Sequence, residues 1–264
     1  MKNCLILGSG RSGTSMLAGT LYQSGYYLGD KLHKPEISNP KGFFEWMTIN
    51  QINEQILNPY AKRGLREKLI ETFLKKGTVT NPIGRNQKWL LSLPPEVEIN
   101  DTTPEVETNI KEVLAKEPFC YKDPRFSYTL PIWEKFLKPD TVFICVFREP
   151  DITVNSILKE CRSREYLRTL YINRRMAYSA WLNIYSHVFK HAAHLGKMVF
   201  IHYDQVFNGT GLQMLSDILE VPLKKEFVDK RLKRTLPGGP VPQKVKNLYL
   251  RLCEAAQYNK TTNV

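Results

Sequence analysis

Four short apolar runs stand out along the chain, at Cys4–Leu7, 119–121, Val142–Phe147 and Met198–His202. Runs of this length without polar alternation are typical of strands that are buried on both faces. Each run except the last leads into a turn or into a segment with helical periodicity. The pattern predicts an α/β fold in which helices flank a doubly wound parallel sheet, related to the P-loop proteins.

Apolar residues at helical spacing predict helices at 15–23, 48–57, 65–74, 106–115, 152–161, 174–195, 211–219 and 245–257. A chain of 264 residues is long enough to form one domain of this kind. Prolines and glycines between residues 78 and 104 predict an irregular insertion that would line a substrate site. A second breaker, at 237–240, separates the core from a C-terminal helical tail at about 241–258.

The composition limits the classes of binding partner and the cellular compartment that we expect. The 38 lysines and arginines exceed the 26 acidic residues, so the net charge of +12 favours an anionic partner: nucleic acid, a membrane surface or a multiply phosphorylated small molecule. Short basic clusters, at 230–234 and 162–168, are more typical of solvated helix faces. The five cysteines show no C-x-x-C spacing, and no apolar run reaches eighteen residues. We therefore expect a cytoplasmic protein without a transmembrane segment; the oligomeric state stays open.

The first apolar run leads into a glycine-rich loop, from Gly8 to Ser15, and then into a predicted helix. In this arrangement backbone N–H groups and the helix N-terminus bind anions. The spacing from Gly8 to Gly13 matches the Walker A pattern, but Thr14 stands where a kinase has lysine. The strand at 141–147 ends at Arg148 instead of a metal-binding aspartate. A P-loop kinase is therefore disfavoured, and the cation at the strand end would attract a phosphate.

These features resemble the sulfotransferases that use 3′-phosphoadenosine 5′-phosphosulfate (PAPS) and release adenosine 3′,5′-bisphosphate. The resemblance implies that the 5′-phosphosulfate is bound by Arg11, Ser12, Gly13, Thr14 and Ser15. A second family signature, an arginine at a strand end with a serine eight residues later, implies that Arg148 and Ser156 bind the 3′-phosphate. A guanidinium and a hydroxyl from one strand–helix unit would share this phosphate. No metal is expected.

The segment from Tyr121 to Arg125, Tyr-Lys-Asp-Pro-Arg, resembles the Lys-Asp-Pro segment of tyrosylprotein sulfotransferases. The resemblance implies that Lys122, together with Arg11, offsets the charge that develops on the leaving 5′-phosphate. Without the resemblance, Lys122 and Asp123 would be expected to form a local ion pair on the surface.

The general base is the least determined part of the site. Related enzymes use a histidine or a glutamate that follows the second strand. Our first candidate is Glu45, which closes an Asn-Pro-x-Gly-aromatic-aromatic-Glu segment similar to one in bacterial members. His33 is the second candidate, followed by Asp30 and Glu36. The aromatic residues expected to line the acceptor pocket are Phe43, Phe44, Trp46 and Trp89.

The favoured function is transfer of a sulfuryl group from PAPS, by in-line displacement, to a hydroxyl or amine. The acceptor would be a small molecule, a sugar, a lipid or a peptide. The alternatives are a P-loop kinase and a non-catalytic nucleic-acid-binding protein. The last would need a contiguous basic stripe with exposed aromatic residues, which the sequence does not clearly show, so no nucleic acid is expected as a partner.

Overall fold

The computed structural model describes residues 1–36, 38–61, 84–195, 198–229 and 238–259. Its centre is a four-stranded parallel sheet with the strand order β2-β1-β3-β4. The strands are β1 (Cys4–Leu7), β2 (Cys120–Lys122), β3 (Val142–Phe147) and β4 (Met198–His202). All four predicted strands and the α/β fold class are confirmed. β2 begins and ends one residue later than predicted, so that Lys122 is itself a strand residue.

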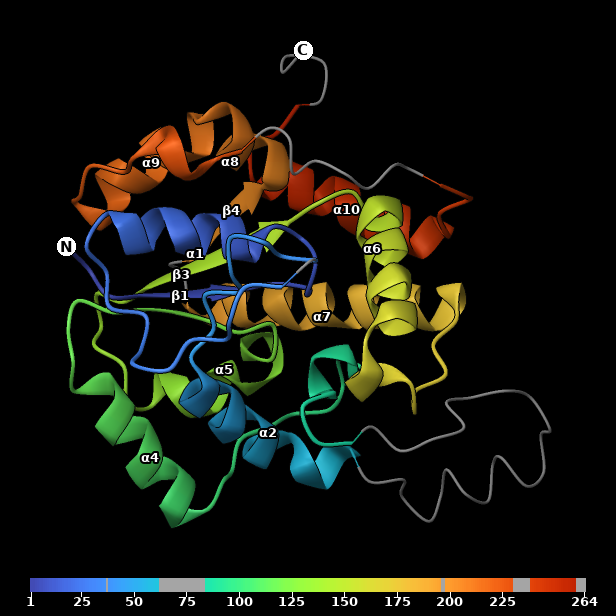
Figure 1. Ribbon diagram of the computed structural model, residues 1–264, viewed down its shortest axis with the longest axis horizontal. Helices are drawn as coiled ribbons and strands as arrows, with labels where there is room; N and C mark the ends of the chain where they lie inside the picture. Colours follow the sequence, from blue (N-terminus) through green and yellow to red (C-terminus); the bar gives the residue numbers. More distant parts are fainter. Residues whose placement is uncertain (37, 62–83, 196–197, 230–237, 260–264) are drawn as a thin grey trace.

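Both faces of the sheet are covered by helices, as expected for strands that are apolar throughout (Figure 1). Along β1, Cys4 and Ile6 belong to one hydrophobic cluster, whereas Leu5 and Leu7 belong to the other. Helices α1 (Thr14–Gln23), α8 (Tyr203–Asn208) and α9 (Thr210–Leu219) lie on the first face (Figure 1). The opposite face is covered by α2 (Met47–Ala61), α4 (Pro104–Leu114), α5 (Phe126–Glu134) and α7 (Arg174–Leu195).

The remaining helices are α6 (Pro150–Ser163), α10 (Gln243–Ala255) and the short 3₁₀ helices η1 (Lys88–Leu90), η2 (Glu165–Leu167) and η3 (Lys225–Phe227). The predicted insertion carries only η1 in its described part, and α10 forms the predicted C-terminal tail. The helix expected at 65–74 and the basic segment at 230–234 lie outside the described residues. No helix in the described ranges has an apolar stretch long enough to cross a membrane.

Two helices were not predicted, α5 and α8. Seven of the nine residues of α5 are buried, and Pro131 lies within it, so the segment has little of the amphipathic periodicity that identifies a helix. α8 has only six residues and follows β4 directly.

Because the strands are parallel, the carboxyl ends of β1, β2 and β3 meet at one edge of the sheet, where ligands bind in open α/β folds.

Candidate active site

The segment between β1 and α1 is a tight loop with Gly8 at φ 123° and Gly13 at φ 98°. A Cβ atom on Gly8 would lie 2.2 Å from the carbonyl oxygen of Val146, and one on Gly13 would lie 2.4 Å from the ring of Tyr203. Both positions therefore require glycine, for space as well as for backbone conformation. The loop packs directly against the end of β3 and the start of α8.

Two buried side chains from distant parts of the chain anchor this loop. The N–H of Gly8 donates to Ser127 Oγ at 3.1 Å. The N–H of Ser9 donates to the Tyr185 hydroxyl at 3.1 Å, and this hydroxyl donates to the carbonyl oxygen of Val146 at 3.0 Å. Ser127 and Tyr185 lie 119 and 176 residues from their partners in the chain, so no local sequence signal identifies them.

The side chain of Ser12 stabilises the loop and its contact with β3. Its hydroxyl is fully buried, and it donates to the carbonyl oxygens of Ser9 at 2.6 Å and Val146 at 3.1 Å. Part of the hydroxyl-rich sequence is thus explained by bonds within the loop.

The N-terminus of α1 presents backbone donors. Gly13 is the N-cap residue, and no side chain caps the helix. Among the described residues, none accepts a hydrogen bond from the N–H groups of Gly13, Thr14 or Ser15. The first turn also contains no acidic residue. These are the features of a helix terminus that binds an anion.

Arg148 directly follows β3 and is 7% exposed. Its guanidinium lies 4.3 Å from the ring centroid of Tyr203, the residue that also borders Gly13. Its Nε and Nη2 atoms are buried and have no hydrogen-bond partner in the described part of the chain, and the Glu149 carboxylate lies at 4.0 Å from Nε. Buried polar groups are normally hydrogen-bonded, so these donors fit an anionic ligand at this position.

The structure brings Arg11 and Ser156 together. Arg11 Nε donates to Ser156 Oγ at 3.0 Å, and Nη2 donates to the carbonyl oxygen of Ser38 at 3.2 Å. Nη1 lies 3.7 Å from the Glu160 carboxylate, and burial lowers the pKa of the Arg11 guanidinium. The two residues that the resemblance assigns to opposite ends of one nucleotide thus contact each other. Arg11 would have to exchange these partners to reach a 5′-phosphosulfate.

Lys122 connects the loop to the first candidate base. Its side chain is 2% exposed, and its Nζ lies 3.3 Å from Ser15 Oγ and forms an ion pair with Glu45. The prediction of a surface pair between Lys122 and Asp123 is wrong, because both side chains are buried. Asp123 pairs instead with Arg125, at 3.0 Å.

His33 and Glu45 lie opposite each other in a short antiparallel pairing. The bridge joins Leu32 and Trp46, and the N–H of His33 donates to the carbonyl oxygen of Glu45 at 3.0 Å. The backbone pairing thus brings the two candidate bases to neighbouring positions. Among the described residues between α1 and α2 there is no sheet strand, so the expected second strand before Glu45 is not found there.

The carboxylates of Asp30 and Glu36 form ion pairs with cations other than Lys122. The Asp30 carboxylate is 68% exposed and lies 3.5 Å from Lys116 Nζ. Glu36 forms an ion pair with Arg164 on the loop after α6. Neither acidic side chain pairs with Lys122, which leaves Glu45 and His33 as the better-placed candidates.

The four aromatic residues expected at the acceptor site divide into two pairs. Phe44 and Trp46 pack against other aromatic rings and belong to the two hydrophobic clusters. Trp89 packs against the glycine-rich loop, since a Cβ on Gly10 would lie 2.6 Å from its ring. The ring of Phe43 lies 6.4 Å from the imidazole of the second candidate base.

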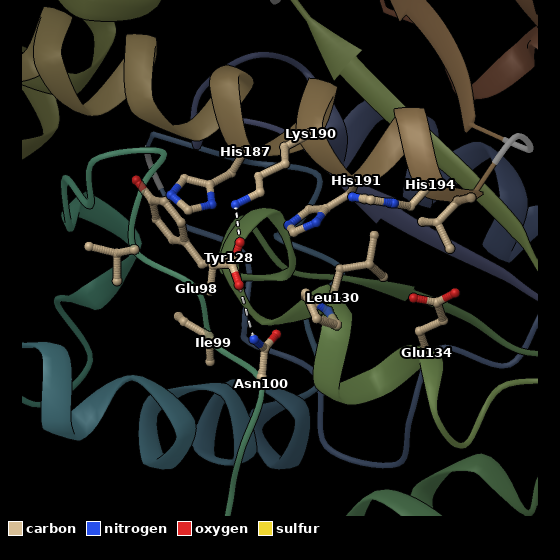
Figure 2. Close-up of a pocket in the computed structure, with 13 residues that line it drawn as sticks. Glu98, Ile99, Asn100, Tyr128, Leu130, Glu134, His187, Lys190, His191 and His194 are labelled. Carbon is tan, nitrogen blue, oxygen red and sulfur yellow. Dashed lines mark hydrogen bonds and ion pairs between the residues drawn. The ribbon is translucent and has the colours of Figure 1, made fainter.

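A separate cavity of about 170 Å³ lies between α5, α7 and the segment at 97–100 (Figure 2). His187 and His191 from α7 line it beside Tyr128 of α5, whose ring is 4.9 Å from that of His187. Burial lowers the pKa of both imidazoles, that of His191 to about 4. None of the predicted site residues lines this cavity.

A family model and several solved structures match this chain. The model of the sulfotransferase family matches residues 4–220. The sulfotransferase domain of the curacin biosynthetic pathway shares the fold, with a TM-score of 0.52, 14% sequence identity and 98% of both chains covered. Sulfotransferase STF9 of Mycobacterium avium has a TM-score of 0.52 and 13% identity, and the match covers 98% of this chain and 77% of the other. A sulfotransferase of Alicyclobacillus acidocaldarius has a TM-score of 0.50 and 12% identity, and the match covers 99% of this chain and 98% of the other. No curated protein sequence matches the chain. The chain belongs to the sulfotransferase family.

Proposed function

We propose that this protein transfers the sulfuryl group of PAPS to a hydroxyl or amine of an acceptor, by in-line displacement. The observation that carries the proposal is the buried Arg148 guanidinium, whose Nε and Nη2 atoms have no partner among the described residues. It lies over the ring of Tyr203, which also borders Gly13 at the N-terminus of α1. A ligand with two anionic ends, such as a 3′,5′-phosphorylated adenosine, matches two separate groups of donors.

The donor would be bound by backbone and side-chain groups from two strand–helix units, β1–α1 and β3–α6. The N–H groups of Gly13, Thr14 and Ser15, which have no acceptor within the described ranges, would hold the 5′-phosphosulfate. Arg148 and Ser156 would hold the 3′-phosphate. Binding of this kind would fix the sulfur atom relative to the acceptor, and positioning contributes a large part of the rate in such displacements.

Lys122 and Glu45 would carry the chemical step. The acceptor oxygen or nitrogen attacks sulfur while the bond from sulfur to the 5′-phosphate oxygen breaks. Lys122 Nζ, beside Ser15 and the loop, would offset the charge that develops on this leaving oxygen. Glu45, which forms an ion pair with Lys122 beside the loop, would take the proton of the acceptor. His33, across the antiparallel pairing, is the second candidate base.

Proposed partners follow from the same site. The acceptor would be a small molecule, a sugar, a lipid or a peptide that carries the reacting group, and no metal is required. The five cysteines are free, and four are buried, which fits the reducing cytoplasm as the proposed location.

A thermal-shift comparison tests the proposed donor against the kinase alternative. A ligand that binds only the folded state raises the melting temperature by mass action. We expect adenosine 3′,5′-bisphosphate to raise it more than ATP with Mg²⁺ does at equal concentration. A larger shift with ATP and Mg²⁺ would favour a kinase, and a shift only with oligonucleotides would favour a nucleic-acid-binding protein.

A further inference from the structure

A buried hydrogen-bonded chain lies behind the two candidate bases. His33 Nε2 is 2.7 Å from the side-chain oxygen of Asn50, a residue in the first turn of α2. Asn50 Nδ2 donates to Asp123 Oδ2 at 2.8 Å. Asn50 is 6% exposed and Asp123 is fully buried. The chain therefore links an exposed residue, His33, to a carboxylate inside the protein.

The surroundings of Asp123 determine which end of the Asn50 amide faces His33. Asp123 Oδ2 also accepts from Asn53 Nδ2 at 3.0 Å. Its Oδ1 accepts from the Arg125 N–H at 2.9 Å and from Arg125 Nη1 at 3.0 Å. With four donors directed at its two oxygens, this carboxylate acts only as an acceptor. The NH₂ group of Asn50 must therefore face Asp123, which leaves its oxygen for His33.

This orientation in turn determines the proton on His33. An amide oxygen only accepts hydrogen bonds, so the proton of the neutral imidazole must be on Nε2. The lone pair of the ring is then on Nδ1, and no described residue donates a hydrogen bond to that atom. His33 therefore offers an acceptor atom, Nδ1, on a residue that pairs with Glu45 through the backbone.

We propose that Asn50, oriented by Asp123, is a positioning residue that holds His33 with its proton on Nε2 and keeps Nδ1 available to the acceptor substrate. The role toward substrate rests on the proposed function. When the reacting O–H or N–H faces Glu45, a second donor on the acceptor binds His33 Nδ1. The site then favours acceptors with two adjacent donors, as in a sugar, another vicinal diol or a primary amine, over an isolated hydroxyl.

The protonation of His33 can be measured without any substrate. In protein labelled with ¹⁵N-histidine, long-range ¹H–¹⁵N correlations identify the protonated nitrogen of each of the five imidazoles, and His33→Gln assigns the His33 signals. We expect His33 to carry its proton on Nε2. His187 and His191 serve as references, because their Nε2 atoms lie 3.0 and 3.2 Å from backbone carbonyl oxygens. A proton on Nδ1, or a mixture of both forms, in the wild type overturns the proposal.

Three variants test the link to Asn50. Asn50→Leu removes the amide at similar volume, so His33 should become a mixture of both neutral forms. Asn50→Ala removes the same amide without adding a branched side chain, so it should give the same mixture and covers the case in which the leucine variant does not fold. Asn53→Leu is the matched control, because it takes one donor from Asp123 without touching His33. An unchanged His33 in Asn50→Leu contradicts the proposal.

The substrate role has its own readout. With a diol or sugar acceptor, Asn50→Leu should raise the acceptor KM roughly three- to tenfold, the value of one hydrogen bond, while binding of adenosine 3′,5′-bisphosphate stays unchanged. An unchanged KM overturns the contact with substrate. If the wild type does not bind the bisphosphate at all, the proposed function fails, whereas the histidine measurement stands.

Discussion

Glu45 is the carboxylate that the structure places next to the buried ammonium group of Lys122. If it is the general base, Glu45→Gln should lower kcat by about 10²- to 10⁴-fold, the usual contribution of a positioned base. Binding of adenosine 3′,5′-bisphosphate should barely change, because the carboxylate faces the acceptor. A base must be unprotonated to work, so the rate of the wild type should fall as the pH is lowered. The pH–rate profile of the variant should no longer show this fall.

Glu36→Gln is a matched control for this variant. Glu36 lies in the same segment of the chain but pairs with Arg164, so its substitution should leave kcat within a few-fold of the wild type. If Glu45→Gln keeps nearly full activity while His33→Ala loses it, the base is His33. Should both variants stay active, Asp30 and Glu36 become the candidates.

At the scale of elements, the loop between β1 and α1 depends on one hydroxyl from α7. Tyr185→Phe would leave the Ser9 N–H without its acceptor and remove one donor from the carbonyl oxygen of Val146. A buried group left unpaired costs about 1–3 kcal/mol, so the free energy of unfolding in urea should fall by that amount. Tyr171→Phe is the control, since Tyr171 is 63% exposed. Equal stability of the Tyr185 and Tyr171 variants would show that the loop does not need this anchor.

Elements with a strong local pattern were predictable from sequence. The strand β3 is buried at all six positions, and its continuous apolar run identifies it. The loop from Gly8 to Ser15 and the position of Arg148 are likewise local features, because each follows a strand directly. α5 was missed for the opposite reason: burial on nearly all sides removes the periodicity from its sequence.

Contacts between distant segments were not predictable in this way. Lys122 and Glu45 are 77 residues apart, and Arg11 and Ser156 are 145 residues apart. All four residues were candidates from the sequence, but their spacing along the chain does not show which side chains are in contact. Lys122 illustrates the limit: an adjacent Lys-Asp pair suggests a surface ion pair, whereas tertiary packing buries both residues and gives each another partner.

For the whole molecule, stability should depend on pH through His191. Burial, and then the charge of His187, lowers the pKa of His191 to about 4, whereas the unfolded value is about 6.5. Between these values the unfolded chain binds the proton and the folded protein does not, so stability is present above about pH 6.5 and is lost as the pH falls toward 4. The loss over this window is roughly 3 kcal/mol, at about 1.4 kcal/mol per pKa unit.

Urea unfolding at pH 5 and pH 7 measures this effect. His191→Gln keeps a donor for the Ser127 carbonyl oxygen but does not titrate, so it should reduce the difference in unfolding free energy between the two pH values. His194→Gln, an exposed position on the same helix, should not. Equal pH dependence in the wild type and in His191→Gln would contradict the assignment.

For the molecule as a whole, turnover should not need a divalent metal. The loop has Thr14 at the lysine position of a kinase, and β3 is followed by a cation instead of a metal-binding carboxylate. We therefore expect the rate in EDTA to equal the rate in added Mg²⁺. Activity that is abolished by EDTA and restored by Mg²⁺ would reverse this part of the account.

The central claim is that Arg148 binds the 3′-phosphate of the donor. Calorimetric titration of the wild type and of Arg148→Ala, each with adenosine 3′,5′-bisphosphate and with adenosine 5′-phosphate, tests it most directly. A charge-assisted contact is worth about 1.5–3 kcal/mol, so the variant should bind the bisphosphate about 10- to 150-fold more weakly and the 5′-phosphate almost as well as the wild type. Equal losses for the two ligands would contradict the claim, because Arg148 would then not distinguish a nucleotide with a 3′-phosphate from one without it.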